Sequence, residues 1–133
     1  MKKYILLFML LPFFISCSSD ENEPMQDYTS FTLENKSSVD LPNVVIGYLT
    51  DGRYKKIADL GNINKGEISN EIRIANSSIK EIYVFFDYSD YVAAIRADIS
   101  FIVYENKLNK FVLPSGIKGI AITDKTDPAQ YPQ

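Results

Sequence analysis

The chain has 133 residues, with 14 Lys and Arg side chains against 17 Asp and Glu side chains, and a net charge of −3. This acidic balance argues against a nucleic-acid-binding protein, because such proteins carry basic patches. The chain has no histidine and a single cysteine, which excludes Ser-His-Asp and Cys-His catalysis and a disulfide within the chain.

The first segment is a short apolar run behind two lysines. Lys2 and Lys3 precede apolar residues 4–15, and the run ends in Phe14-Ile15-Ser16-Cys17. A basic start and a stretch of about 7–15 apolar residues predict a secretory signal. A membrane-spanning helix needs about 20 apolar residues, which this run does not reach. An ordinary signal peptide is the alternative, but it favours an Ala-x-Ala-like cleavage pattern that is not present.

The residues before Cys17 resemble the lipobox of bacterial lipoproteins. The resemblance implies a signal peptide over residues 1–16, cleavage before Cys17 and acylation of its sulfur. The remaining 117 residues carry 12 basic and 17 acidic side chains, a net charge of −5. This charge does not favour docking on anionic lipid, so the acyl chains must hold the protein on its lipid membrane.

Residues 17–27 form the predicted lipidated tether. Asp20, Glu21 and Glu23 lie in an acidic cluster just behind the cysteine. The cluster is similar to the export signal that some Gram-negative bacteria use to send lipoproteins to the outer face of the outer membrane. An acidic, polar composition also predicts a disordered spacer. We therefore expect an outer-membrane protein at the cell surface, with the periplasmic face as the alternative.

Residues 28–123 are predicted to form one all-β domain, because β-branched and aromatic residues recur with a period of two. In the first half, Asp51-Gly52 between two apolar runs predicts a hairpin. The loop 61–66 follows the hairpin. The strands expected in this half begin with alternating residues around Phe31 and Leu33 and continue with Val44–Leu49, Tyr54–Leu60 and Glu67–Ile74, the last with Ile68, Ile72 and Ile74 on one face.

The second half contains a strand that is apolar on both faces, Ile82–Phe86, which we expect in the middle of a sheet. From Ala93 to Tyr104 apolar and polar residues alternate, which predicts a two-faced strand. Helical spacing within 91–104, with Asp90 as an N-cap, is the alternative and would give an α+β fold. A turn at 106–109 and strands at Phe111–Leu113 and Ile117–Ile122 complete the set, and the charged residues 124–133 predict a flexible tail.

About seven short strands in roughly 100 residues predict a two-sheet β-sandwich of immunoglobulin-like size. The stretch from Leu60 to Ser69 places a leucine, a short loop and Gly-Glu before a small polar residue. It is similar to a turn of bacterial immunoglobulin-like modules, as is Asn35 ahead of the 41–44 strand entry. The resemblance covers about a third of the mature chain and implies a fold, with no activity.

The loop after the central strand holds the candidate binding residues. Flat rings beside carboxylates stack on sugars and hydrogen-bond to them, and loops on rigid scaffolds often bind ligands. The alternative is a polar turn whose tyrosines cover the end of the sandwich, and the absence of tryptophan favours it. The candidate ligand-binding residues are Asp87, Tyr88, Asp90 and Tyr91.

Other chemistry has weaker support. Asp87, Ser89 and Asp90 offer oxygen ligands for calcium, but no twelve-residue EF-type loop is present, so we expect neither a metal nor a cofactor. Paired carboxylates, with Asp98 as a further acid, remain the enzymatic alternative. The sequons at 35–37 and 76–78 are expected to be chance matches.

The sequence therefore predicts a non-enzymatic, membrane-anchored envelope lipoprotein that displays a binding surface for a protein or glycan partner. An accessory subunit of an envelope complex is one alternative, in which an exposed sheet edge pairs with a partner strand. A surface lipoprotein that protects its own cell from a toxin is another.

Overall fold

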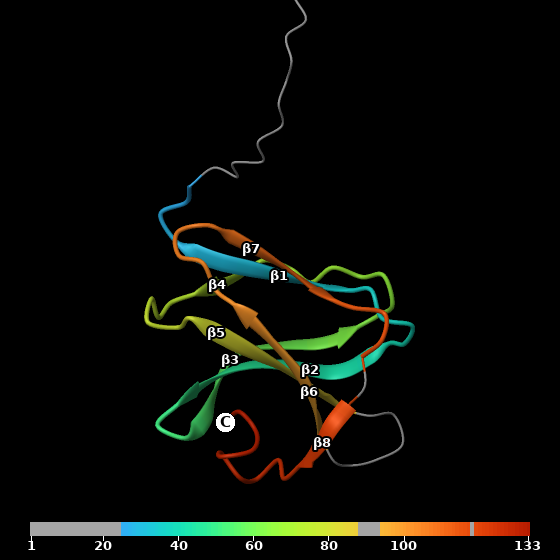
Figure 1. Ribbon diagram of the computed structural model, residues 1–133. Helices are drawn as coiled ribbons and strands as arrows, with labels where there is room; N and C mark the ends of the chain where they lie inside the picture. Colours follow the sequence, from blue (N-terminus) through green and yellow to red (C-terminus); the bar gives the residue numbers. More distant parts are fainter. Residues whose placement is uncertain (1–24, 88–93, 118) are drawn as a thin grey trace, which may run out of the picture.

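The computed structural model describes residues 25–87, 94–117 and 119–133, and within the strands it does not describe the side chains of 94–98 and 119–122. These residues form two β-sheets packed face to face (Figure 1). The strands are β1 (Thr29–Asn35), β2 (Leu41–Thr50), β3 (Arg53–Ile63), β4 (Ile72–Ile74), β5 (Glu81–Asp87), β6 (Ala94–Ile102), β7 (Leu108–Leu113) and β8 (Gly119–Thr123).

The small sheet has the order β4-β1-β7 and the large sheet the order β3-β2-β5-β6-β8. All paired strands are antiparallel except β1 and β7, which run parallel over Ser30–Asn35 and Leu108–Leu113. Because the described elements are all strands in two facing layers, the prediction of an all-β sandwich is confirmed.

The hairpin between β2 and β3 turns where the sequence predicts it. Thr50 pairs with Arg53, so the loop consists of Asp51 and Gly52 alone. Both residues have positive φ, 50° and 71°. Two successive residues at positive φ make a type I′ turn, whose twist matches that of the flanking strands, and Asp-Gly tolerates this conformation well.

The main core lies between the two sheets. Alternate residues of β5 point inward, so Ile82, Val84 and Phe86 are buried there. Phe31 and Leu33 of β1 meet them from the small sheet and have no exposed surface. Because β5 lies third of five in its sheet, the prediction of a mid-sheet strand at 82–86 is confirmed.

Residues 94–102 form β6, so the strand prediction for this region holds and the helical alternative is excluded there. Apolar residues in this stretch also occur at helical spacing, but pairing with β5 satisfies the backbone hydrogen-bonding groups in the strand conformation. The registered pairs run from Glu81 opposite Ile102 to Asp87 opposite Ala94. Tertiary pairing therefore decides between the two periodicities.

The strand predicted at Glu67–Ile74 is too long. Only Ile72–Ile74 forms β4, and Ile68 makes one isolated bridge to Glu34. Ile68 is 58% exposed, so it does not share a buried face with Ile74. Conversely, residues 61–63 belong to β3 rather than to the predicted loop 61–66. A positive φ of 65° lets Gly61 pair with Val44 across a bulge, and Ile63 pairs with Leu41.

The C-terminal segment 124–133 packs on the large sheet, where the sequence predicts a flexible tail. The backbone N–H groups of Tyr54 and Lys56 donate to the carbonyl oxygens of Pro128 (2.7 Å) and Gln133 (3.1 Å). Pro132 is fully buried. Figure 1 shows this segment on the side of the large sheet opposite the small one, as a third layer.

Side-chain bonds fix the start of this segment. The Asp124 carboxylate accepts hydrogen bonds from the backbone N–H (2.8 Å) and hydroxyl (2.7 Å) of Thr126. These bonds hold the pKa of the Asp124 carboxyl below its usual value of 3.8. Charge and proline content suggest fraying, but the turn and the apolar contacts beyond it order the segment.

Candidate binding groove

The predicted site residues are only partly within the described structure. Asp87 ends β5, while Tyr88, Asp90 and Tyr91 lie outside the described residues, as do Ser89, Cys17, Asp20, Glu21 and Glu23. Asp98 is part of β6, but its side chain is not described. Asp87 is therefore the one predicted binding residue whose environment the structure defines.

The Asp87 carboxylate is used in contacts within the domain. Its Oδ2 accepts a hydrogen bond of 2.8 Å from Asn43 Nδ2. Its Oδ1 is buried and forms an ion pair with the Lys125 ammonium. The side chain is only 18% exposed. Asp87 thus fastens the C-terminal segment to the end of β5, which leaves little of its carboxylate for a ligand.

The described residues contain no group of three side chains able to hold a metal ion. Of the predicted calcium ligands only Asp87 falls in that part of the chain, and it already has two partners. A hard cation needs several oxygen ligands together. The described geometry therefore gives calcium no support.

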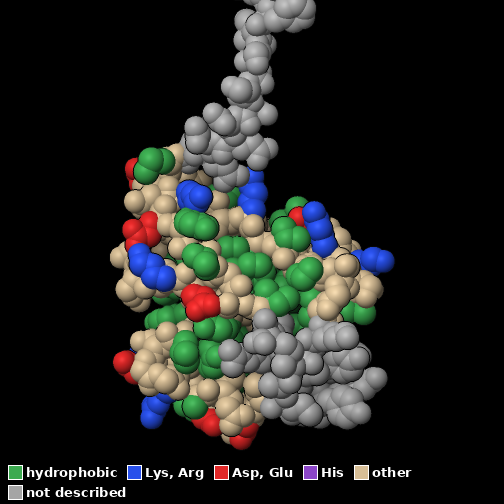
Figure 2. Space-filling model, in the orientation of Figure 1, with side chains coloured by type: hydrophobic (Ala, Val, Ile, Leu, Met, Phe, Trp, Pro, Cys, Tyr) green, Lys and Arg blue, Asp and Glu red, His purple; other side chains and the backbone are tan. Residues whose placement is uncertain are grey.

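A hollow lined by described residues lies elsewhere, between the end of β6 and β7. It is an open groove of about 460 Å³. Figure 2 shows hydrophobic side chains gathered on this face of the molecule. The lining residues come from both sheets and the turn that joins them: Ser100, Phe101, Ile102, Tyr104, Lys107, Leu108, Asn109, Lys110 and Phe111.

The floor of the groove is aromatic. The rings of Phe101 and Phe111 stack with centroids 4.7 Å apart, and Phe111 also contacts Phe31 of the core at 5.7 Å. The rim is apolar and open to solvent, with Ile102 64% exposed and Tyr104 58% exposed. Exposed apolar side chains around a buried aromatic floor are typical of an interaction site.

Asn109 fixes the turn at one end of the groove. Its Nδ2 donates to the carbonyl oxygens of Ser30 (3.0 Å), Tyr104 (2.9 Å) and Lys107 (3.2 Å). Its Oδ1 accepts from the Tyr104 N–H at 2.9 Å. The side chain is buried, so these bonds satisfy polar groups that water does not reach. The turn that carries Tyr104 is therefore rigid.

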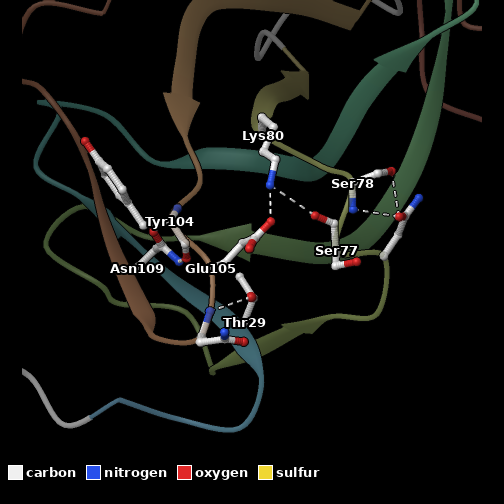
Figure 3. Close-up of polar contacts among 9 residues, drawn as sticks. Thr29, Ser77, Ser78, Lys80, Tyr104, Glu105 and Asn109 are labelled. Carbon is white, nitrogen blue, oxygen red and sulfur yellow. Dashed lines mark hydrogen bonds and ion pairs between the residues drawn. The ribbon is translucent and has the colours of Figure 1, made fainter.

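Two further contacts hold the same turn. Figure 3 shows the Glu105 carboxylate directed at the Lys80 ammonium, with which it forms an ion pair, and Tyr104 and Asn109 on the other side of the turn. Thr29 Oγ1 accepts a hydrogen bond of 3.0 Å from the N–H of Asn106, which has a φ of 56°. Asparagine tolerates this left-handed conformation better than most residues.

The charged groups of the groove are basic. The described lining residues include two lysines, Lys107 and Lys110, and no carboxylate. The Lys107 ammonium lies 4.5 Å from the centre of the Tyr104 ring. A cation over an aromatic face is attracted to it, which keeps this charge at the rim. The groove thus differs in sign from the chain as a whole.

Sequence reasoning missed this groove as a site. The alternation in β6 and the turn before β7 were both predicted, but neither pattern shows that two strands of different sheets leave a gap. Tyr104 and Lys107, three residues apart across a turn, are the signal nearest to it. Two other hollows, about 300 Å³ beside Tyr48 and about 170 Å³ beside Ile68, are smaller.

The sequon at 35–37 is structural. Asn35 is fully buried, and its Nδ2 donates to the carbonyl oxygens of Val39 (2.9 Å) and Ile63 (3.1 Å). Its Oδ1 accepts from Ser37. An amide nitrogen in this position is not accessible to a modifying enzyme in the folded protein, in agreement with the expected chance match.

No protein-family model, curated protein or solved structure matches the chain. Within the described ranges, no helix has the length and apolar character needed to cross a membrane.

Proposed function

We propose that this chain is a lipid-anchored protein of the bacterial outer membrane whose β-sandwich binds a partner without catalysing a reaction. The observation that supports binding is the groove between β6 and β7, with its stacked floor and exposed apolar rim. β-Pairing and the hydrogen bonds of Asn109 hold its walls in place, so little conformational freedom is lost when a partner binds. An accessory subunit of an envelope complex is the specific form of this proposal that the groove favours.

Binding is favoured over catalysis by the ionisable groups at hand. The chain has no histidine to act as a base near neutral pH. Asp87 is the candidate residue whose carboxylate is described, and this carboxylate already accepts a hydrogen bond from Asn43 and forms an ion pair with Lys125. The groove presents lysines and rings, which suit recognition of a charged or apolar surface.

The anchor is proposed from the sequence at Cys17. The described end of the tether, residues 25–27, lies beside the groove, because the Gln26 N–H donates to the carbonyl oxygen of Asn106 at 2.8 Å. Asn106 belongs to the turn that leads into β7. Acyl chains would hold the protein on the membrane, residues 17–27 would set its distance, and the groove would recognise the partner.

The anchor and its orientation are tested in cells with an epitope-tagged copy. We expect a radioactive fatty acid to label the native chain and not Cys17→Ser, which should also leave the membrane fraction. External protease should remove the native tag and spare the tag of a variant with Asp20, Glu21 and Glu23 changed to Ala. Protection of both tags would place the domain in the periplasm, and absence of label on the native chain would remove the anchor.

A further inference from the structure

The outer edge of β7 borders the groove. The sheet order places β1 on one side of β7 and no described strand on the other. The Ser30 and Lys36 N–H groups donate to the carbonyl oxygens of Lys107 and Leu113, so the odd-numbered residues of this stretch direct their backbone groups toward β1. Backbone groups alternate in direction along a parallel ladder, so those of Leu108 and Val112 point away from β1.

The other sheet edges are less suited to pairing. β4 has three residues. The edge of β3 is partly covered by the C-terminal segment, and register shifts interrupt its ladder with β2. Short, bulged or covered edges are the usual protection against unwanted pairing. Of the edges whose side chains are described, that of β7 is the one that is regular over six residues.

From these contacts we propose that an extended segment of a partner protein, with alternating acidic and apolar side chains, binds as a fourth strand of the small sheet beside β7. This deepens the proposed function: it rests on the groove as the partner site and not on the lipid anchor. Pairing with an exposed edge gives affinity through the backbone and specificity through alternate side chains.

The groove offers exposed apolar side chains that the apolar residues of such a segment can contact. A strand beside β7 lies over the opening of the groove, next to Ile102 at the end of β6 and Tyr104 in the turn before β7. Covering these side chains removes apolar surface from water, on the order of 25 cal/mol per Å². The groove thus selects apolar residues at alternate positions of the incoming strand.

The charges favour an acidic partner strand over a second copy of this chain. Lys107 and Lys110 line the groove, and the described lining has no carboxylate. In a twofold antiparallel pairing of two β7 strands centred on Lys110, the lysine faces itself. Like charges directly opposite are destabilising, and a lysine on an edge strand is a known protection against self-pairing. Asp or Glu opposite these positions converts repulsion into attraction.

Fluorescence anisotropy of the full chain in detergent, with micelles alone as blank, tests the proposal. The probe is a labelled eight-residue peptide of alternating Glu and Val. We expect it to bind about tenfold more tightly than a Lys-Val peptide, a difference in binding free energy of about 1.4 kcal/mol. Binding should weaken as salt is added, because salt screens exposed charges. A peptide with four Glu followed by four Val should bind no better than the Lys-Val peptide.

Two substitutions at one position separate backbone pairing from side-chain contact. Val112→Pro removes an N–H that points away from β1 and should weaken binding about tenfold, whereas Val112→Thr keeps the N–H and should stay within about threefold. If Val112→Pro fails to fold, the double variant Lys107→Glu with Lys110→Glu takes its place. It should reverse the preference toward the Lys-Val peptide, because both basic side chains of the lining become acidic. A folding defect cannot produce such a reversal.

Equal binding of the two charge types, no binding of the Glu-Val peptide, or unchanged binding by folded Val112→Pro would each overturn the proposal. Sedimentation of the full chain supplies a further test. A dimer that Val112→Pro dissociates would show that a second copy occupies the edge instead. None of these outcomes depends on fatty-acid labelling of Cys17, so failure of the strand proposal is distinct from failure of the anchor.

Discussion

The two faces of the large sheet are buried in different ways. The inner face meets the small sheet in one continuous core that includes Phe31, Leu33 and Ile82. The outer face has a small cluster of Val45, Tyr54 and Phe85, covered by the C-terminal segment. The inner core therefore ties together strands distant in sequence, whereas the outer cluster relies on ten residues at one end of the chain.

The outer cluster is mainly aromatic. The Phe85 ring contacts those of Tyr54 and Tyr131 edge to face, at centroid distances of 5.1 and 5.5 Å. Tyr131 comes from the C-terminal segment and Pro132 follows it in a tight fit. A Cβ placed on Gly47 would lie 2.5 Å from Pro132 Cγ. Glycine at this position of β2 thus makes room for the segment to lie against the sheet.

The largest effect is expected for the inner core. Leu33→Ala creates a cavity at a fully buried site and should lower the free energy of unfolding by about 2–5 kcal/mol. Urea denaturation followed by circular dichroism measures it. Val112→Ala on the exposed side of β7 is the control and should change stability by less than about 0.5 kcal/mol. Similar losses in both variants would mean that the inner face is not the dominant core.

The polar part of the inner core should come next. Asn109→Ala removes four hydrogen bonds and leaves the Tyr104 N–H without its acceptor, at a cost of about 1–3 kcal/mol. Thermal unfolding measures the change. Asn109→Asp keeps the acceptor but loses the donors and buries a carboxylate against three carbonyl oxygens, so it should cost at least as much as Asn109→Ala. If neither variant loses stability, the turn that holds Tyr104 does not depend on this side chain.

Overpacking under Pro132 should have a comparable or smaller effect on the outer face. Gly47→Ala forces Pro132 or β2 to move, and overpacking of this kind costs about 1–3 kcal/mol. Adding Pro132→Ala should recover part of the loss, because the two residues are in contact and their effects are not additive. Gly116→Ala, whose new Cβ meets nothing within 4 Å, is the matched control. Strict additivity of the double variant would contradict the contact.

The two faces also separate what the sequence predicts from what it does not. Alternation in β6, the Asp-Gly hairpin and the doubly apolar run of β5 follow from local periodicity and turn chemistry, and each was predicted in place. A strand that is apolar on both faces requires a cover on both faces. The sequence offered no obvious second cover, because residues 124–133 are rich in charges and proline. Tyr131 and Pro132 of this segment pack on the outer face of the large sheet. Two adjacent residues are too few to produce a periodic pattern that the sequence could reveal.

The candidate site shows the same limit. Asp87 lies at the end of a central strand, where binding loops are common, but its partner Lys125 is 38 positions away in the chain. No local pattern reveals such a pair. The groove beside β7 depends on which strands remain unpaired, and sheet order is not encoded in the periodicity of any single strand. Site prediction from this sequence therefore fails where long-range pairing decides.

The smallest effect is a pH dependence of the outer cluster. Burial, followed by the charges of Asp87 and Asp59, raises the pKa of Tyr131 above its usual value of 10.0. A phenol with a raised folded-state pKa favours folding fully below pH 10.0, and this contribution is lost as the pH rises through the folded-state pKa. Stability should therefore fall above about pH 10 more steeply in the native chain than in Tyr131→Phe, which cannot ionise.

Chemical denaturation at pH 8 and pH 11 in both proteins isolates this effect. The other eight tyrosines are common to both chains, so the difference between the two profiles belongs to Tyr131. Since the ring is only partly buried, we expect a small difference that shrinks further as salt screens the carboxylates. Parallel profiles would mean that Tyr131 ionises without leaving the sheet. The C-terminal segment would then be held chiefly by the Pro132 contact and by its backbone bonds to β3.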